Sequence, residues 1–542
     1  MKHIMRSPDR ISYSIKTGSS EIRDELPITF SPLPNGGRAA KIRIHAELNH
    51  ASHVVPEAVI RLDAADAQIF MNGYQTWTYC PEYTAKDRIR GLHGLPKAMI
   101  NAWSLDRYGD YHFVDYPNKR GILHGESYCY FRTGEKFLLI GSLDETNGYT
   151  LFRYESDAKE LTVRRDCDSL EDVSGRFEAF ALFIAEGSES EVFDAWFAAM
   201  GIKRIPAEPI SGYSSWYNRY QDITERTITE DLIGCAKVMK SGELFQIDDG
   251  WEPYVGDWLV PDQEKFPHGM KTAADAIHEK GYKAGLWLAP FVAQKDSALV
   301  REHPDWLLLH DGAPWLNGSN WGGFYSLDIE KPEVVQYVEE VFRRVFDEWG
   351  FDLVKLDFLY GAAPFGTKDE TRAGRMIRAM KLLRRVCGDH AILGCGVPVM
   401  PAFGLVEYCR ISCDVGLDWD DKPWMRLIHR ERVSTRQAMG NTVFRRELNG
   451  RAYLSDPDVY FLREDNIRLS YEQKLNLGRL NALLGGVFLT SDNMGSYSEK
   501  QLADYRELIR MRDAKLTGVD VSGKRINVRY ELDGKAGIIS FE

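Results

Sequence analysis

The 542-residue sequence lacks any apolar run of the roughly 18 residues that a membrane-spanning helix needs. Its first residues, MKHIMRSPDRISYSIK, also lack the apolar core of a secretory signal. There is no long basic block, and the net charge is −12. Nucleic acid and anionic membranes are therefore not expected partners, and we expect a cytoplasmic protein.

Metal-binding and disulfide patterns are missing as well. The eight cysteines are scattered along the chain and none forms a Cys-x-x-Cys pair, which predicts free thiols in a reducing compartment. The 13 histidines form neither a His-x-His nor a His-Glu-x-x-His pattern. The sequence therefore predicts no metal site and no cofactor.

The N-terminal part of the chain, residues 1–205, is expected to be an all-β domain. Short apolar or alternating runs recur between turn residues, as in AKIRIHAEL, EKFLLIGSL and RFEAFALFI. Short strands at regular spacing are typical of a β-sandwich. Residues 189–201 then predict a helix, and the two prolines of residues 205–209 indicate a linker.

Strand-like and helical patterns alternate from residue 206 to residue 513, which predicts a parallel sheet. Eight strand-like runs occur, at residues 210–216, 244–249, 283–290, 353–358, 391–396, 409–415, 452–461 and 486–493. Eight such repeats are typical of a (β/α)8 barrel. The alternative, a doubly wound sheet, would need a glycine-rich phosphate loop after its first strand, and SGYSSWYNRY is not one.

The tail of the chain, residues 514–542, contains INVRYEL and AGIISFE joined through Asp533-Gly534, which predicts a hairpin. A lone hairpin is only marginally stable, so this one should pack on the barrel or belong to a longer β-domain. The predicted fold is therefore multidomain, with an N-terminal β-sandwich, a TIM barrel and a short C-terminal β segment.

Lys355 and Asp357 stand two residues apart near the end of the fourth predicted barrel strand. Side chains at this spacing on a strand point to the same side, so a cation and a carboxylate face one place. In (β/α)8 barrels, the chemistry takes place at the carboxyl ends of the strands. We therefore expect Asp357 to be an ionised nucleophile whose pKa is lowered by Lys355.

Carboxylates recur at the ends of other predicted strands: Asp248, Asp249, Asp414, Asp456, Asp458 and Asp492. Any one of them could be a helix N-cap, but Asp248, Asp249, Asp357 and Asp414 are most simply explained by a shared polar pocket. Glycoside hydrolysis requires two carboxyl groups that flank the scissile bond. Asp414 lies in the apolar run ISCDVGL, where desolvation would raise its pKa and keep the proton that a general acid needs.

Several segments, in this order, resemble the compact α-galactosidases (melibiases) of glycoside hydrolase family 36, which share a clan with family 27. These segments are YSSWYNRYQDIT, FQIDDGWEPYVGDWLVPDQEKFP, GLWLAPF, EHPDW, VKLDFL, ILGCGVPVMPAFG, RISCD and LSDPDVYFLRE. The likeness covers residues 210–510 and extends more weakly to NGYQTW at residues 72–77.

The resemblance implies a retaining double displacement on terminal α-galactosides, with an α-galactoside oligosaccharide as the substrate. It implies that Asp357 is the nucleophile and Asp414 the acid/base. It further implies a galactose site in which Asp248 and Asp249 hold the 4- and 6-hydroxyls, Lys355 reaches ring hydroxyls, Arg410 lies near the 2-hydroxyl, and Trp216, Trp287, Cys395 and Trp77 line the pocket.

The chain departs from the larger members of that family at two places. They follow the cysteine with a run of glycines and carry an S-D-D-T-D motif, whereas this chain has Gly396-Val397-Pro398 and Ser412-Cys413-Asp414. An N-acetylgalactosaminide therefore stays open as a substrate. A transglycosylase, an α-glucosidase of related barrel type and a non-catalytic sugar-binding protein also stay open, and a panel of p-nitrophenyl glycosides separates them.

Overall fold

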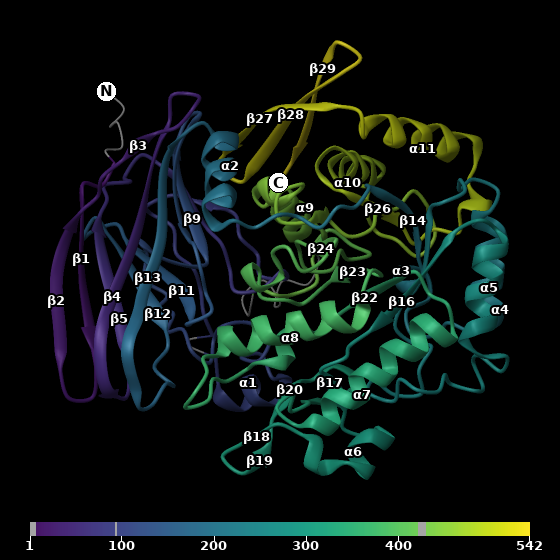
Figure 1. The fold of residues 1–542 in the computed structure, drawn as a ribbon. Coiled ribbons are helices and arrows are strands. Elements are labelled where there is room, and N and C mark those ends of the chain that lie inside the picture. The colour runs from purple at the N-terminus through teal and green to yellow at the C-terminus, as the bar shows by residue number, and fades with distance from the viewer. Residues whose placement is uncertain (1–6, 93–94, 421–429) are drawn as a thin grey trace.

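The computed structural model describes residues 7–92, 95–420 and 430–542. Two antiparallel sheets lie on one side of the molecule, a parallel eight-stranded barrel with its helices on the other, and a small antiparallel sheet rests on the barrel (Figure 1). The predicted fold class is confirmed. Within the described ranges, none of the helices has the length and apolarity that crossing a membrane requires.

The two N-terminal sheets pack face to face around a shared core. The first has the order β2 (Glu21–Pro27), β1 (Arg10–Lys16), β5 (Val55–Arg61), β12 (Glu160–Asp166), β11 (Tyr149–Glu155) and β8 (Ile122–Glu126). The second has the order β3 (Ser31–Pro32), β4 (Arg38–Ala51), β13 (Val173–Gly187), β10 (Lys136–Ser142), β9 (Tyr128–Thr133), β6 (Gln68–Met71) and β7 (Glu82–Tyr83). In β4, every second residue from Ile42 to Leu48 is buried, so the alternation in AKIRIHAEL marks the face that meets the other sheet.

The barrel strands all pair in parallel. In chain order they are β14 (Ile210–Ser214), β15 (Leu244–Ile247), β16 (Lys283–Leu288), β22 (Leu353–Leu356), β23 (Ala391–Gly394), β24 (Tyr408–Arg410), β25 (Leu454–Asp456) and β26 (Val487–Thr490). β26 pairs with β14, and the Gly486 amide donates to the Ser455 carbonyl at 2.8 Å, which joins the last two strands. Most strands end before the predicted boundary, because the polar residues that follow turn into the barrel mouth instead of continuing the ladder.

Helices surround the barrel. The longer ones are α4 (Glu225–Cys235), α5 (Gly269–Glu279), α7 (Pro332–Arg343), α8 (Arg372–Cys387), α9 (Thr435–Phe444), α10 (Tyr471–Leu484) and α11 (Glu499–Met511). α7 begins at Pro332, whose fixed φ suits a first helical position, and buries Val334, Val338, Val341 and Phe342. This spacing of three and four residues is typical of a helix that buries one face.

The segment between β16 and β22 holds more than a helix. It contains a small antiparallel sheet of β17 (Val292–Gln294), β21 (Phe324–Ser326) and β20 (Leu316–Gly318), the helix α6 (Ala298–Glu302) and a hairpin of β18 (Leu309–His310) and β19 (Ala313–Pro314). These elements lie at the lower edge of Figure 1 near α1 (Lys97–Trp103). Sequence patterning did not predict them, because their strands are only two or three residues long.

The C-terminal segment forms three antiparallel strands: β27 (Lys515–Ser522), β28 (Arg525–Leu532) and β29 (Lys535–Phe541). The prediction of a two-stranded hairpin there missed β27. The sheet packs on the barrel, where the Asn476 amide of α10 donates to the Ser540 carbonyl at 3.2 Å. A third strand and this contact supply the support that a lone hairpin lacks.

Arg445, which follows α9, connects the N-terminal sheets to the barrel. Its buried guanidinium donates to the side-chain oxygen of Asn72 at 3.1 Å and to the carbonyls of Gln75 and Thr76 at 3.1 and 2.6 Å. Charge-assisted hydrogen bonds of this kind are among the stronger ones in proteins. They fix the loop that carries Trp77 against the barrel mouth.

Candidate active site

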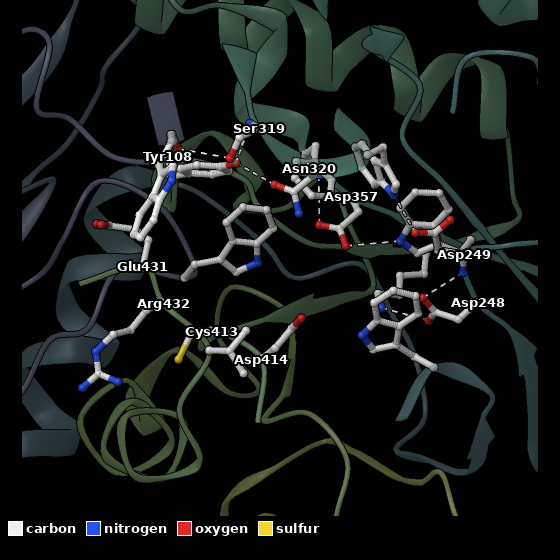
Figure 2. Close-up of a pocket in the computed structure, with 18 of the residues that line it drawn as sticks. Tyr108, Asp248, Asp249, Ser319, Asn320, Asp357, Cys413, Asp414, Glu431 and Arg432 are labelled. Carbon is white, nitrogen blue, oxygen red and sulfur yellow. Dashed lines mark hydrogen bonds and ion pairs between the residues drawn. The ribbon is translucent and has the colours of Figure 1, made fainter. Parts of the chain in front are cut away.

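The carboxyl ends of the barrel strands surround a cavity of about 350 Å³. Eight of the ten predicted site residues line it: Trp77, Trp216, Asp248, Asp249, Trp287, Lys355, Asp357 and Asp414. Trp287 and Lys355 are on strands β16 and β22, Trp216 begins the short helix α3 (Trp216–Arg219), and the aspartates follow strand ends. Residues that are far apart in the sequence thus share one hollow (Figure 2).

Asp357 follows β22 directly and is held at both oxygens. Its Oδ2 accepts from the Trp287 indole N–H at 3.2 Å, and its Oδ1 accepts from the Phe358 amide at 2.9 Å. Phe358 has a φ of 52°, a left-handed conformation that is uncommon for a bulky residue. This turn ends the strand and leaves the Asp357 carboxyl in the cavity wall, with little freedom to rotate.

Burial raises the pKa of Asp357; the charge of Lys355 lowers it, and the charge of Asp414 raises it again. The prediction of a lowered pKa for Asp357 is therefore wrong. The physical reason is that burial outweighs the cation, and that the Lys355 ammonium pairs directly with another carboxylate. Its Nζ lies 2.9 Å from Oδ2 of Asp248.

Asp248 is fully engaged in a network on the floor of the barrel. Besides Lys355, its Oδ2 accepts from the Gln246 amide at 2.7 Å and from the Ser214 hydroxyl at 3.3 Å. Its other oxygen accepts from the Asp249 amide at 3.0 Å. These donors from several segments fix the orientation of the Asp248 carboxylate.

Asp249 is oriented by two side chains from other segments. The Gln221 amide donates to its Oδ2 at 3.0 Å, and the Trp321 indole N–H donates to the same oxygen at 3.0 Å. Trp321 belongs to the segment between β16 and β22, which sequence patterning left unassigned. The barrel and its inserted segment therefore position Asp249 jointly.

Asp414 enters the cavity from the segment after β24. Its side chain is 35% exposed, and its Oδ1 accepts from Arg410 Nη1 at 2.9 Å. Arg410 is itself buried and lies 3.1 Å from Asp456 and 3.0 Å from Asp458. Arg410 is thus the centre of an ion cluster behind Asp414 and does not line the cavity. Asp456 and Asp458, each of which could have been a helix N-cap from the sequence alone, hold it there.

Cys395 also lies behind the cavity wall. Its sulfur accepts from the Trp77 indole N–H at 3.3 Å, and the thiol hydrogen-bonds the Asp357 carboxyl. Burial raises the pKa of the Cys395 thiol well above its ordinary value, so it stays protonated. Cys395 therefore supports Trp77 and Asp357 from behind.

Asp357 and Asp414 project into the cavity from opposite sides, as Figure 2 shows. Their charges interact, since the carboxylate of Asp414 raises the pKa of Asp357. The arrangement offers one carboxyl group held at both oxygens and a second that is partly exposed. Chemically, this suits one attacking carboxylate and one proton donor on either side of a bound ring.

Several further residues line the cavity that sequence reasoning did not identify: Trp103, Leu105, Tyr108, Ser319, Asn320, Trp321, Phe358, Cys413, Glu431, Arg432 and Val433. They come from five stretches of the chain, at residues 103–108, 319–321, 358, 413 and 431–433. The Tyr108 hydroxyl donates to the side-chain oxygen of Asn320 at 2.6 Å, which joins the N-terminal region to the segment between β16 and β22. The tryptophans beside loops were the only signal in the sequence, because loop residues follow no periodic pattern.

In the part of the chain that the structure describes, no group of three or more His, Cys, Asp or Glu side chains could hold a metal ion.

Comparison with known proteins gives partial matches in sequence. Residues 207–377 match the family model Melibiase. Alpha-galactosidase Mel36A of Lactobacillus acidophilus is 33% identical over 151 residues, which cover 27% of this chain and 20% of that protein. The A type blood alpha-D-galactosamine galactosaminidase of Flavonifractor plautii is 34% identical over 140 residues, 24% of this chain and 13% of that protein. The matched segments thus span a fifth or less of these two relatives.

Comparison with solved structures covers nearly the whole chain. TtGalA, an alpha-galactosidase from Thermus thermophilus solved with p-nitrophenyl alpha-D-galactopyranoside, superposes with a TM-score of 0.73 and 27% identity over 94% of this chain and 98% of that one. GH36 alpha-galactosidase AgaA from Geobacillus stearothermophilus shares the fold, with a TM-score of 0.56 and 13% identity over 97% of this chain and 81% of that one. Residues 207–377 thus resemble the Melibiase family, and the fold of nearly the whole chain is similar to that of an alpha-galactosidase.

Proposed function

We propose that this protein is a retaining α-galactosidase that removes terminal α-linked galactose from oligosaccharides. The observation that carries the proposal is the pair Asp357 and Asp414, which face one another across a single cavity and whose charges interact. The relatives support the substrate class, since TtGalA has been solved with p-nitrophenyl alpha-D-galactopyranoside and with stachyose.

In the first step, an oxygen of Asp357 attacks the anomeric carbon of the galactose. The bond between that carbon and the glycosidic oxygen breaks, and Asp414 gives its proton to the departing oxygen, so the aglycone leaves as an alcohol. A galactosyl ester of Asp357 remains and Asp414 is now a carboxylate. The hydrogen bonds from Trp287 and Phe358 hold Asp357 in place for this attack.

In the second step, Asp414 takes a proton from a water molecule, and the water oxygen attacks the anomeric carbon. The ester bond to Asp357 breaks, galactose leaves with its original configuration, and both carboxyl groups return to their starting states. The partial exposure of Asp414 to the cavity gives this water access to it.

The floor of the cavity supplies the contacts for the sugar. Lys355, Asp248 and Asp249 offer a fixed donor and two fixed acceptors to ring hydroxyls. Asp248 holds Lys355, and Gln246 and Gln221, which do not line the cavity, hold Asp248 and Asp249. The tryptophans of the wall, Trp216 and Trp287, present flat apolar faces to the C–H face of a sugar ring. A terminal hexose is the ligand that such a pocket suits.

Azide rescue tests the two roles separately. With p-nitrophenyl α-galactoside and azide, the variant D357G should form β-galactosyl azide, because azide takes the place of the missing nucleophile. The variant D414G should form the α-azide, because azide then attacks the galactosyl ester. Rescue with the same anomer in both variants, or in neither, would contradict the assignment.

A substrate panel tests the sugar. Hydrolysis of the p-nitrophenyl α-galactoside in preference to the α-glucoside and the α-N-acetylgalactosaminide supports the proposal. The N-acetylgalactosaminide belongs in the panel because the Flavonifractor plautii relative is named a galactosaminidase. Binding of galactose without any hydrolysis would instead indicate a sugar-binding protein.

A further inference from the structure

Glu252 lies next to the galactose site but does not line the cavity. Its side chain is 4% exposed, and its Oε2 accepts from the Gly250 amide at 3.2 Å. Gly250 has a φ of 115°, and a side chain there would collide with Gln221. The turn at Gly250 folds the chain back, so that the carboxyl of Glu252 reaches the carboxyl of Asp249 and hydrogen-bonds it.

Two buried carboxyl groups in contact must share a proton, because two negative charges at that distance in a poorly solvated place repel strongly. Asp249 is 3% exposed and accepts from the Gln221 amide and the Trp321 indole. Within the described residues, the N–H groups that donate to the Glu252 carboxyl are the backbone amides of Gly250 and of Glu252 itself, and none belongs to a side chain. Asp249, with two side-chain donors from other segments, keeps the charge, and Glu252, whose pKa is raised well above its ordinary value by burial, carries the proton.

The surrounding charges agree with this assignment. Asp248, on the same segment, is neutralised by Lys355 of β22. Lys265 lies on the other side of the turn, where its ammonium donates to the Gly250 carbonyl at 3.0 Å. Burial and the charge of Asp249 raise the pKa of Glu252 well above its ordinary value. Among the residues that the structure describes, no cation contacts the Glu252 carboxyl, so nothing there favours its ionised form.

We propose that Glu252 is a positioning residue of the galactose site, whose carboxylic acid donates a hydrogen bond to Asp249 and keeps this aspartate aimed into the cavity. The inference rests on the proposed function, in which Asp249 binds galactose hydroxyls. It adds the requirement that Glu252, which does not line the cavity, stays protonated. When Glu252 loses this proton, the two carboxylates repel and Asp249 moves away from the sugar.

The test compares E252Q with E252M in the full-length protein. The glutamine cannot ionise but still donates an N–H to Asp249, whereas the methionine fills the space and donates nothing. With p-nitrophenyl α-galactoside at neutral pH, E252Q should keep KM within about threefold of wild type. E252M should raise KM by about tenfold or more while kcat changes by less, since the lost contact serves binding.

The pH profile and an infrared spectrum give readouts that a purely structural role would not move. A rise of KM at alkaline pH in the wild type should be absent in E252Q. The infrared difference spectrum between wild type and E252Q at pH 8 should contain the C=O band of a protonated carboxyl group. E145Q is the control, because Glu145 is another buried carboxyl that does not line the cavity, and its replacement should leave the KM profile unchanged.

A wild-type KM in E252M, an alkaline rise of KM that persists in E252Q, or a missing carboxyl band would each overturn the inference. If E252M does not fold, E252Q and the infrared spectrum still decide. A wild-type protein that hydrolyses no α-galactoside would instead overturn the proposed function. If the wild type hydrolyses α-galactosides and the Glu252 variants have the KM of the wild type, only this inference is overturned.

Discussion

Replacing Lys355 with methionine should destabilise the barrel by about 3–5 kcal/mol, because it leaves Asp248 as a buried charge without its cation. The two side chains are 7% and 2% exposed, and their charged atoms lie 2.9 Å apart. With an effective dielectric constant of about 20, two unit charges at this distance attract by about 6 kcal/mol. The cost of removing both ions from water offsets much of this attraction, so the pair itself adds little net stability.

The loss in the single variant is nevertheless large, since the remaining partners of Asp248 only partly replace an ammonium ion. The Gln246 amide and the Ser214 hydroxyl still donate to it, which favours the lower end of the range. The double variant K355M/D248N removes both charges together. It should recover most of the lost stability and remain within about 2 kcal/mol of wild type, because no buried charge is left unpaired.

Thermal unfolding of wild type, both single variants and the double variant measures this coupling. At roughly 2 °C per kcal/mol for a large domain, K355M should lower the midpoint by about 6–10 °C. K271M is the matched control, since Lys271 also pairs with an aspartate, at 2.7 Å, but on the surface with side chains 62% and 53% exposed. Its midpoint should hardly change, because water screens an exposed pair.

The reasoning fails if K355M lowers the midpoint no more than K271M does. It also fails if the losses of K355M and D248N simply add in the double variant, since additive losses mean that the two side chains do not interact. If D357N recovers the stability lost in K355M and D248N does not, Lys355 pairs with Asp357, the partner that the sequence suggested.

Three further predictions concern other parts of the molecule. The acid limb of kcat/KM should lie above the pKa of an ordinary aspartate, because burial raises the pKa of Asp357. The charge of Asp414 also raises the pKa of Asp357, so D414N should move this limb to lower pH. The substrate for D414N is α-galactosyl fluoride, whose leaving group needs no acid. Burial raises the pKa of Glu145 from 4.5 to about 7, so the folded state holds this proton more tightly than the unfolded chain does. The stability that this proton contributes is complete below about pH 4.5 and falls by on the order of 3 kcal/mol up to about pH 7. E145Q should therefore flatten the dependence of the unfolding midpoint on pH in that window, and an unchanged slope would contradict this prediction. R445M should lower the unfolding midpoint and reduce kcat/KM together, because it frees the loop that carries Trp77, and a change in stability without any loss of activity would argue against a role of that loop in the site.

The resemblance of the barrel segments to a known family was visible in the sequence because each motif is local. Alternating apolar residues, helix-forming spacing and polar residues directly after a strand are properties of neighbouring residues, and they predicted all eight barrel strands. The same local logic put Asp357 and Asp414 at strand ends, from which both project into the cavity. Where strands were two or three residues long, as in β17 to β21, the periodic signal was too short to detect.

Pairing between side chains could not be predicted in the same way. Lys355 lies two residues from Asp357 but bonds Asp248, which is 107 residues away in the sequence. Arg410 is enclosed by Asp456, which ends the next strand, and by Asp458, two residues farther along the chain. Which carboxylate a buried cation contacts depends on the stagger of neighbouring strands, and a single sequence does not contain that information.

Short-range patterns of polarity along the chain were enough to predict the order of strands and helices, the acidic residues at the mouth of the barrel and the class of chemistry that these residues suit. The folded chain was needed to show which charges neutralise one another, that loops around Trp103 and Trp321 complete the cavity, and that Glu252 contacts Asp249. Burial is the physical reason for this division. It determines how strongly each charge is desolvated and which partner it meets, and it arises only when distant segments pack together.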